Sequence, residues 1–210
     1  MKIAVIGTGN MGSGFARALV AAGKEVIIGH RDPAKAAALA ADIGSNVEGG
    51  GIPVALKVSD IAIFALPYDA TIAHLKEAGD LTGKILVDIS NPIAPDYKDL
   101  VLGLTTSAAE EIQKAAPTAT VVKAFNTIFA GLLAQEARPG KTLQVFVAGD
   151  EPSATGKVRD LAAALGFAPT DAGPLTNSRF LEPIGEMNIQ FGYFLGRGTG
   201  IAPAWVSVAD

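Results

Sequence analysis

The most constraining feature of this sequence is a glycine-rich loop that follows a short aliphatic segment at the N-terminus. Residues 2–6 are mostly aliphatic, and the loop reads Gly7-Thr8-Gly9-Asn10-Met11-Gly12. Apolar residues then recur at helical spacing up to Gly23, and a second aliphatic segment follows at 26–28. This order predicts a strand–loop–helix–strand unit with the G-x-G-x-x-G spacing that is typical of dinucleotide-binding folds.

Each glycine of the loop has a physical role in such a site. Gly7 permits a tight turn, Gly9 lets the backbone approach a pyrophosphate, and Gly12 allows the helix to pack closely on the strand. The unpaired N–H groups and the dipole at the start of the helix attract the phosphate charge. The alternative is a glycine-rich turn that binds no ligand, and the order of the surrounding elements argues against it.

The end of the second strand, Gly29-His30-Arg31, favours NADP over NAD. An NAD site usually has an Asp or Glu about 20 residues after the loop, which binds the ribose 2′-hydroxyl. Arg31 instead matches a 2′-phosphate in charge and in bidentate geometry, and Lys35 lies one helical turn further on. Asp32 would be the ribose acid if the strand ended later, but Asp32-Pro33 is more typical of a helix N-cap and first turn. A solvated basic patch is the alternative for His30, Arg31 and Lys35.

Strands and helices alternate along the rest of the chain. We expect further strands at 61–65, 84–89, 120–124 and 143–148, helices at 33–42, 52–57, 70–78, 107–116 and 153–165, and a glycine-rich connection at 44–51. This alternation predicts an α/β fold with a doubly wound, mostly parallel sheet of the Rossmann type. Residues 1–170 are predicted to form the NADP-binding domain, and residues 171–210 a small C-terminal helical appendage that completes the site.

The C-terminal segment differs from the rest. Apolar and amide residues recur at helical spacing at Leu181, Ile184, Met187, Asn188, Phe191 and Phe194. Glu182 and Glu186 are predicted to lie on a solvated helix face rather than to form an acid–base pair. Trp205 is predicted to lie in the core, in a dimer contact or in a wall of the substrate site, the first two being favoured.

Ligands of open α/β sheets bind at the carboxyl ends of the strands. Several strand ends therefore become candidates, although any α/β unit ends its strands in turns. The predicted cofactor contacts are Gly7, Thr8, Gly9, Asn10, Met11, Gly12, His30, Arg31, Lys35, Ala65, Leu66, Pro67, Asn91 and Asn126. Asn126 and Ile128 are the candidates for the hydride-transfer site.

Composition excludes several other functions. The net charge of −4 argues against nucleic acid as the main partner. The chain has no cysteine, which excludes thiolate metal sites and cysteine nucleophiles, and its two histidines are too few for a histidine metal site. We expect no metal. No apolar run reaches the roughly 18 residues that span a membrane, and no secretory signal is visible, so we expect a cytoplasmic protein.

The length of 210 residues leaves about 40 residues beyond the predicted sheet domain, which is too few for a separate substrate domain. No convincing general acid or base appears, and Lys123 is the lysine that stands at a strand end. Hydride transfer between two ring carriers needs little proton chemistry, so we expect the protein mainly to orient two rings. Apolar residues near the C-terminus favour a homodimer.

Over nearly its whole length the chain resembles the NADPH-dependent reductases of the deazaflavin coenzyme F420, whose relatives include the cytosolic domain of STEAP metalloreductases. The resemblance is carried by Ile3–Gly12, Gly29-His30-Arg31 with Lys35, Val121–Ile128 and Leu181-Glu182-Pro183. It implies a Rossmann fold, NADP(H) as cofactor, and a 2′-phosphate site made by His30, Arg31 and Lys35.

The same resemblance leaves the hydride acceptor open. The deazaflavin reductases of the family have a histidine where this chain has Asn126, so the ring acceptor is either coenzyme F420 or a flavin such as FMN or FAD. Two other functions stay open at this point. One is an NADPH-dependent reductase of a small imine or carbonyl compound, because Gly-x-Gly-x-Met-Gly is also similar to pyrroline-carboxylate reductases. The other is a non-catalytic NADP-binding regulator.

Overall fold

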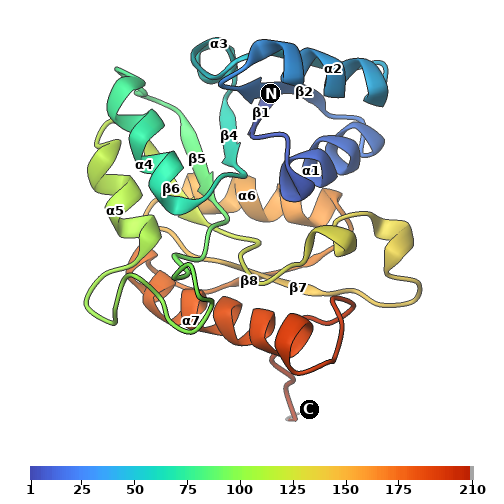
Figure 1. Cartoon of the computed structure of the whole chain (residues 1–210), viewed down its shortest axis with the longest axis vertical. Coiled ribbons are helices and arrows are strands. Elements are labelled where there is room, and N and C mark those ends of the chain that lie inside the picture. Colours follow the sequence, from blue (N-terminus) through green and yellow to red (C-terminus); the bar gives the residue numbers. More distant parts are fainter. Residues whose placement is uncertain (209–210) are drawn as a thin grey trace.

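A six-stranded, all-parallel sheet forms the centre of the computed structural model, which describes residues 1–208 (Figure 1). Its strands lie in the order β3-β2-β1-β4-β5-β6. Their bounds are β1 Lys2–Ile6, β2 Glu25–His30, β3 Val47–Gly51, β4 Ile61–Phe64, β5 Ile85–Asp88 and β6 Thr120–Lys123. The order reverses direction between β1 and β4, which is the switch point where Rossmann folds bind their ligands.

Helices cover both faces of this sheet. They are α1 Asn10–Ala21, α2 Pro33–Ile43, α3 Ile52–Val58, α4 Tyr68–Glu77, α5 Ala108–Ala115 and α6 Pro152–Ala164. Side chains alternate along β1, so that Ile3 and Val5 join the core beneath α1, α2 and α6, while Ala4 and Ile6 join the core beneath α3, α4 and α5. The predicted doubly wound Rossmann fold is confirmed.

One prediction about the sheet is wrong. Residues 44–51 are not only a connection, because Val47–Gly51 form the edge strand β3, paired in parallel with β2. Glycine is usually depleted from strands, which is why the pattern predicted a loop. Here the glycine is needed, since a Cβ at Gly49 would lie 2.3 Å from the backbone of Ala36 on α2.

A second, two-stranded parallel sheet continues the chain after β6. It consists of β7 Gln144–Val147 and β8 Ala168–Asp171, joined through α6. An antiparallel bridge between Lys123 and Ala148 attaches it to β6. The predicted strand at 143–148 is therefore present but lies outside the main sheet, and β8 was not predicted because Pro169 interrupts its apolar pattern.

The C-terminal part contains the predicted helix. It comprises α7 Ser178–Ile189, continued by the π-helical turn η4 Gln190–Phe194, and Figure 1 shows α7 (red) at the opposite end of the molecule from α2 and α3. Three short 3-10 turns precede it: η1 Ala130–Leu132, η2 Gln135–Ala137 and η3 Leu175–Asn177.

Of the two favoured positions of Trp205, the core is wrong, since its side chain is 62% exposed with its ring edge-on to Phe146, and the dimer contact stays a prediction. Within residues 1–208, every helix is too short or too polar to cross a membrane. The division into a dinucleotide-binding domain and an appendage stays a prediction.

Candidate functional site

The glycine loop joins β1 to α1 at a spacing that excludes side chains. Gly7 has a φ of +115°, and a Cβ there would lie 2.5 Å from the carbonyl oxygen of Ala65. A Cβ at Gly12 would lie 2.1 Å from the carbonyl oxygen of Gly7. At Gly9, by contrast, the place of a Cβ has no heavy atom within 4 Å. The first and third glycines thus serve internal packing, while the second leaves the loop open to a ligand.

The N-terminus of α1 has no side-chain cap, a feature that it shares with α3, α4 and α7. Its N-cap is Gly9, and its first turn holds no acidic residue. The starts of α2, α5 and α6 are instead capped by the side chains of Asp32, Ser107 and Glu151. The first N–H groups of α1 are therefore available to an anion, and this cradle fits the pyrophosphate of a dinucleotide.

The predicted 2′-phosphate residues lie at the end of β2 and on the first turns of α2. Asp32 is the N-cap of α2, as expected, and its Oδ1 accepts the Ala34 N–H at 3.1 Å. The His30 Nδ1 lies 3.0 Å from the Asp32 backbone nitrogen and 3.1 Å from the Asp32 carbonyl oxygen, so the ring is held against this turn with its Nε2 edge outside these contacts. Arg31 and Lys35 are exposed, and among the described residues neither has a carboxylate partner within salt-bridge distance. Their role in binding NADP stays a prediction.

The residues expected after β4 lie against the loop. A Cβ at Gly7 would lie close to the Ala65 carbonyl oxygen and to a methyl group of Leu66. Pro67 is exposed and forms the N-cap of α4. The structure thus brings the ends of β1 and β4 together at the switch point, as the strand order requires.

A cavity of about 300 Å³, called the ring pocket below, opens beside the start of α1. Its walls come from α1, the ends of β5 and β6, and α7 with η4. The lining residues are Asn10, Met11, Ile89, Asn91, Phe125, Asn126, Thr127, Ile128, Phe129, Ala130, Gly185, Asn188, Ile189 and Tyr193. None of these side chains carries a charge. The pocket unites the predicted Asn91, Asn126 and Ile128 with residues of α7 and η4 that sequence reasoning had not assigned to the site.

The two asparagine side chains of the ring pocket form a pair whose orientation is fixed by backbone carbonyls. The Asn91 Nδ2 donates to the Asn126 carbonyl oxygen at 2.9 Å, so the Asn91 Oδ1 must act as an acceptor. The Asn126 Nδ2 donates to that Oδ1 at 2.9 Å and to the Leu181 carbonyl oxygen at 2.8 Å. The Asn126 Oδ1 is then buried without a partner.

An unusual backbone conformation precedes Asn126. Phe125 has a φ of +59° although it is not glycine, and its side chain is 1% exposed. This conformation costs about 1–2 kcal/mol for an L-residue. Edge-to-face contacts with Phe15 and Phe167, at centroid distances of 5.1 and 5.9 Å, offset that cost. The aromatic core thus fixes the turn that places Asn126 and Ile128 in the pocket wall.

The prediction that Glu182 lies on a solvated helix face is wrong. Its side chain is 2% exposed, and its Oε1 accepts from the Lys123 Nζ at 2.8 Å. The Asp88 carboxylate accepts from the same ammonium group at 2.8 Å. Lys123 ends a largely buried strand, and a buried lysine requires a charged partner. Its position in the sequence was therefore the signal from which an ion-pair cluster could have been predicted.

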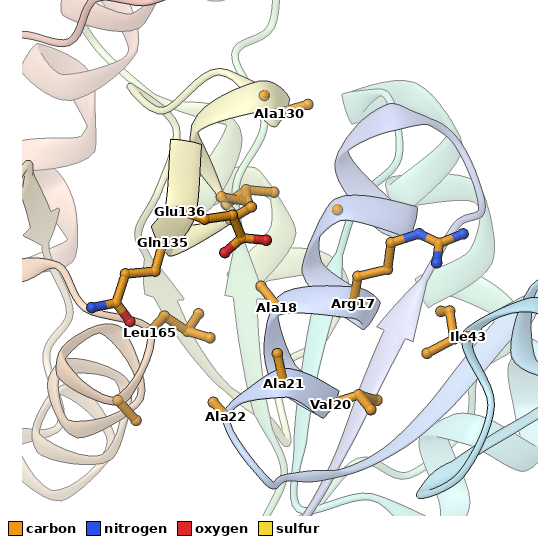
Figure 2. Close-up of a pocket in the computed structure, with 15 residues that line it drawn as sticks. Arg17, Ala18, Val20, Ala21, Ala22, Ile43, Ala130, Gln135, Glu136 and Leu165 are labelled. Atoms are coloured by element: carbon orange, nitrogen blue, oxygen red, sulfur yellow. The ribbon is translucent and has the colours of Figure 1, made fainter. Parts of the chain in front are cut away.

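A larger cavity, of about 550 Å³, lies away from the strand ends (Figure 2). It runs between α1, the turns η1 and η2, and the end of α6, and Arg17, Glu136 and Leu165 mark its walls. Arg17 is already paired with Asp42. This cavity shares only Ala130 with the ring pocket and contains none of the predicted site residues.

Comparisons with known proteins agree with this geometry. Residues 2–92 match the family model described as NADP oxidoreductase coenzyme F420-dependent. The F420-dependent NADP reductase of Methanothermobacter thermautotrophicus is 33% identical over 201 residues, covering 88% of this chain and 86% of that protein. Metalloreductase STEAP3 of Rattus norvegicus is 35% identical over 186 residues, and the chain spans 36% of its length.

Solved structures give the same result. A candidate F420-dependent NADP reductase from an Arthrobacter species has a TM-score of 0.81 and 32% identity, over 91% of this chain and 92% of that one. An imine reductase from Myxococcus stipitatus has a TM-score of 0.68 at 20% identity, over 93% of this chain and 62% of that one, which shows a shared fold.

The fold and these relatives define an NADP-dependent oxidoreductase built on a Rossmann sheet. More particularly, the chain belongs to the family of coenzyme F420-dependent NADP oxidoreductases.

Proposed function

We propose that this chain transfers a hydride between NADPH and a flat ring coenzyme, either the deazaflavin F420 or a flavin, that lies in the ring pocket. The observation that carries the proposal is the position of this uncharged pocket, lined by the amide side chains of Asn91 and Asn126 with their donor and acceptor groups, next to the open glycine loop. The pyrimidine-type rings of deazaflavins and flavins carry an N–H group that can donate to such an acceptor. The names of the F420-dependent relatives support the same class of acceptor.

The chain's residues divide the work of binding NADPH. The N-terminus of α1 and the open face of Gly9 hold the pyrophosphate, while Arg31, Lys35 and the His30 ring hold the 2′-phosphate. Bound NADPH supplies the hydride.

The ring pocket then has two tasks, orientation and exclusion of water. Ile128 and Met11 give it apolar walls, and Phe129 and Tyr193 meet edge to face at a centroid distance of 5.5 Å. The Asn91–Asn126 pair offers polar groups of fixed direction. A ring held between such walls is placed for direct transfer, and no protein group has to move a proton in that step.

Stopped-flow mixing tests this proposal directly. NADPH is mixed with the protein and with F420, FMN or FAD in turn, and the absorbance of NADPH and of each acceptor is followed. We expect rapid oxidation of NADPH with at least one of these rings. Oxidation at the rate of the protein-free blank with all three would overturn the proposal.

A matched variant separates cofactor binding from acceptor chemistry. Arg31→Asp is expected to slow turnover at low NADPH concentration and to leave the order of preference among the three acceptors unchanged, because Arg31 lies outside the ring pocket. A changed order among the acceptors would contradict this division of the site.

A further inference from the structure

Three buried charged side chains lie together behind the ring pocket. The Lys123 Nζ, at the end of β6, donates to the Asp88 Oδ2 at the end of β5 and to the Glu182 Oε1 on α7, both at 2.8 Å. It also donates to the Ser90 carbonyl oxygen at 2.5 Å. The three side chains are between 0% and 2% exposed. We call them the ionic cluster.

Two carboxylates share one ammonium group in this cluster, and a helix start takes part of the excess negative charge. Burial raises the pKa of Glu182, and the neighbouring Asp88 carboxylate raises it further, against the lowering effect of Lys123. Burial alone would lower the pKa of Lys123, but the two carboxylates outweigh it and the pKa is raised. The Glu182 carboxylate also accepts the N–H groups of Ala108 and Ala109, at 3.0 and 3.3 Å, so it stabilises the start of α5.

The segments that supply the ionic cluster also supply the amide pair of the ring pocket. Asn91 follows Asp88 by three residues, and Asn126 follows Lys123 by three. Leu181, whose carbonyl oxygen accepts from the Asn126 Nδ2, directly precedes Glu182. The ionic cluster and the amide pair are therefore joined through three short stretches of backbone.

Helix α7 lies directly on the amide pair. A Cβ at Gly185 would be 2.4 Å from the Asn91 Oδ1, so the backbone of α7 touches this side chain without a gap. A displacement of α7 would open this contact and also remove the Leu181 carbonyl oxygen from Asn126. The ionic cluster joins α7 to the ends of β5 and β6 next to this contact.

We propose that Lys123, Asp88 and Glu182 are positioning residues for hydride transfer, which hold α7 against the sheet so that Asn91 and Asn126 keep one fixed orientation in the ring pocket. This inference rests on the proposed function for its kinetic part. Buried ion pairs generally add little net stability compared with apolar packing. Reacting groups, however, have to be held to within about 0.5 Å, and a cluster that ties three elements together meets that need.

The test compares Glu182→Gln with a matched control on the same two helices. Arg179 on α7 and Glu110 on α5 form another ion pair, with the Arg179 Nε 2.8 Å from the Glu110 Oε2, and neither residue lines the ring pocket. Glu110→Gln therefore weakens an α5–α7 contact without touching the ionic cluster. Both variants are made in the full chain, and their thermal stability is recorded.

The first readout does not depend on activity. The side-chain NH₂ groups of Asn91 and Asn126 are followed by ¹⁵N–¹H NMR, with hydrogen exchange, in the protein without added ligand. We expect both groups to shift and to exchange faster in Glu182→Gln, and to be unchanged in Glu110→Gln. Unchanged signals in folded Glu182→Gln would overturn the proposal, even if the wild-type protein oxidised NADPH with none of the acceptors tested.

The second readout is steady-state kinetics with the acceptor that the stopped-flow experiment identifies. In Glu182→Gln we expect kcat to fall about tenfold or more while the KM for NADPH stays within about twofold, because the dinucleotide is held elsewhere. An equal loss of kcat in Glu110→Gln would show a general structural effect and overturn the positioning role. If Glu182→Gln does not fold, Asp88→Asn takes its place with the same expected results.

Discussion

The glycine loop and the ring pocket are the two halves of the proposed site, and they are built in opposite ways. The loop and the end of β2 come from two short stretches, residues 7–12 and 29–35, whose conformation depends on nearby backbone. The ring pocket draws its walls from α1, from the turns after β5 and β6, and from α7 with η4. A sequence motif can therefore reveal the local geometry of the loop. It cannot reveal which distant segments come together in the ring pocket.

The two halves also differ in charge. The first half offers an uncapped helix start and two exposed cations, which suits phosphate groups. The second half offers an uncharged lining that includes the Asn91–Asn126 amide pair, which suits a neutral ring. The following predictions test whether this division is real, beginning with the largest expected effect.

Gly12→Val should prevent native folding, whereas Gly9→Ala should leave the fold intact. A Cβ at Gly12 would overlap the Gly7 carbonyl oxygen at 2.1 Å, while a Cβ at Gly9 meets no atom within 4 Å. Thermal melting followed by circular dichroism checks both variants. Fluorescence titration of Gly9→Ala should then show weaker NADPH binding, because the new methyl group occupies the open face of the loop. Native melting of Gly12→Val would contradict the packing role of this glycine.

Arg31→Asp should raise the Kd for NADPH about 100-fold and leave the Kd for NADH nearly unchanged. The expected loss of about 2.7 kcal/mol is that of a charge-assisted, bidentate contact to a phosphate. Calorimetric titration with both dinucleotides measures it. Lys157→Asp makes the same change of charge on the exposed face of α6 and serves as control. An equal loss of NADH affinity would show that Arg31 does not distinguish the two cofactors.

Gly185→Ala should lower kcat about tenfold, a barrier increase of roughly 1.4 kcal/mol, with little change in the Kd for NADPH. The new Cβ would be 2.4 Å from the Asn91 Oδ1 and would displace either this side chain or α7. Rapid-mixing kinetics with the preferred acceptor and a separate NADPH titration distinguish the two parameters. A larger effect on NADPH affinity than on kcat would contradict the division of the site into two halves.

Arg17→Ala should have the smallest effect, a change of at most about 0.5 kcal/mol in the free energy of unfolding. Its ion pair with Asp42 is largely in solvent, since the two side chains are 52% and 65% exposed. Urea denaturation measures the stability, and NADPH oxidation should proceed at the wild-type rate. A large loss of activity would indicate that the reaction takes place in the larger cavity shown in Figure 2, which Arg17 lines.

The sequence predicted the parts of the fold that depend on local pattern. The strands β1 and β2, the N-cap at Asp32 and the helix at α7 follow from apolar periodicity and capping residues. It failed at β3, because Gly49 is required by the close approach of the α2 backbone, whereas strand propensity disfavours glycine.

Individual residues of the site were predictable from local pattern, but the contacts between them were not. Asn91 and Asn126 were found because they follow buried strands, although nothing in the sequence shows that they form a pair. Glu182 was misassigned because its partner Lys123 lies 59 residues away in the chain. Contacts over such separations leave no periodic signal, so only the packing of α7 on the sheet reveals them.

The uncapped start of α1 has a consequence for the lifetime of the protein. The side chains of Asp32, Ser107 and Glu151 cap the starts of α2, α5 and α6, whereas the start of α1 has no side-chain cap, and in the proposed site a bound dinucleotide supplies its counter-charge. Binding then adds about 1.4 kcal/mol to the free energy of unfolding for each tenfold excess of NADPH over its Kd. Resistance to heat and to proteolysis will accordingly follow the cellular NADPH concentration, so that the protein persists best where its own reductant is abundant.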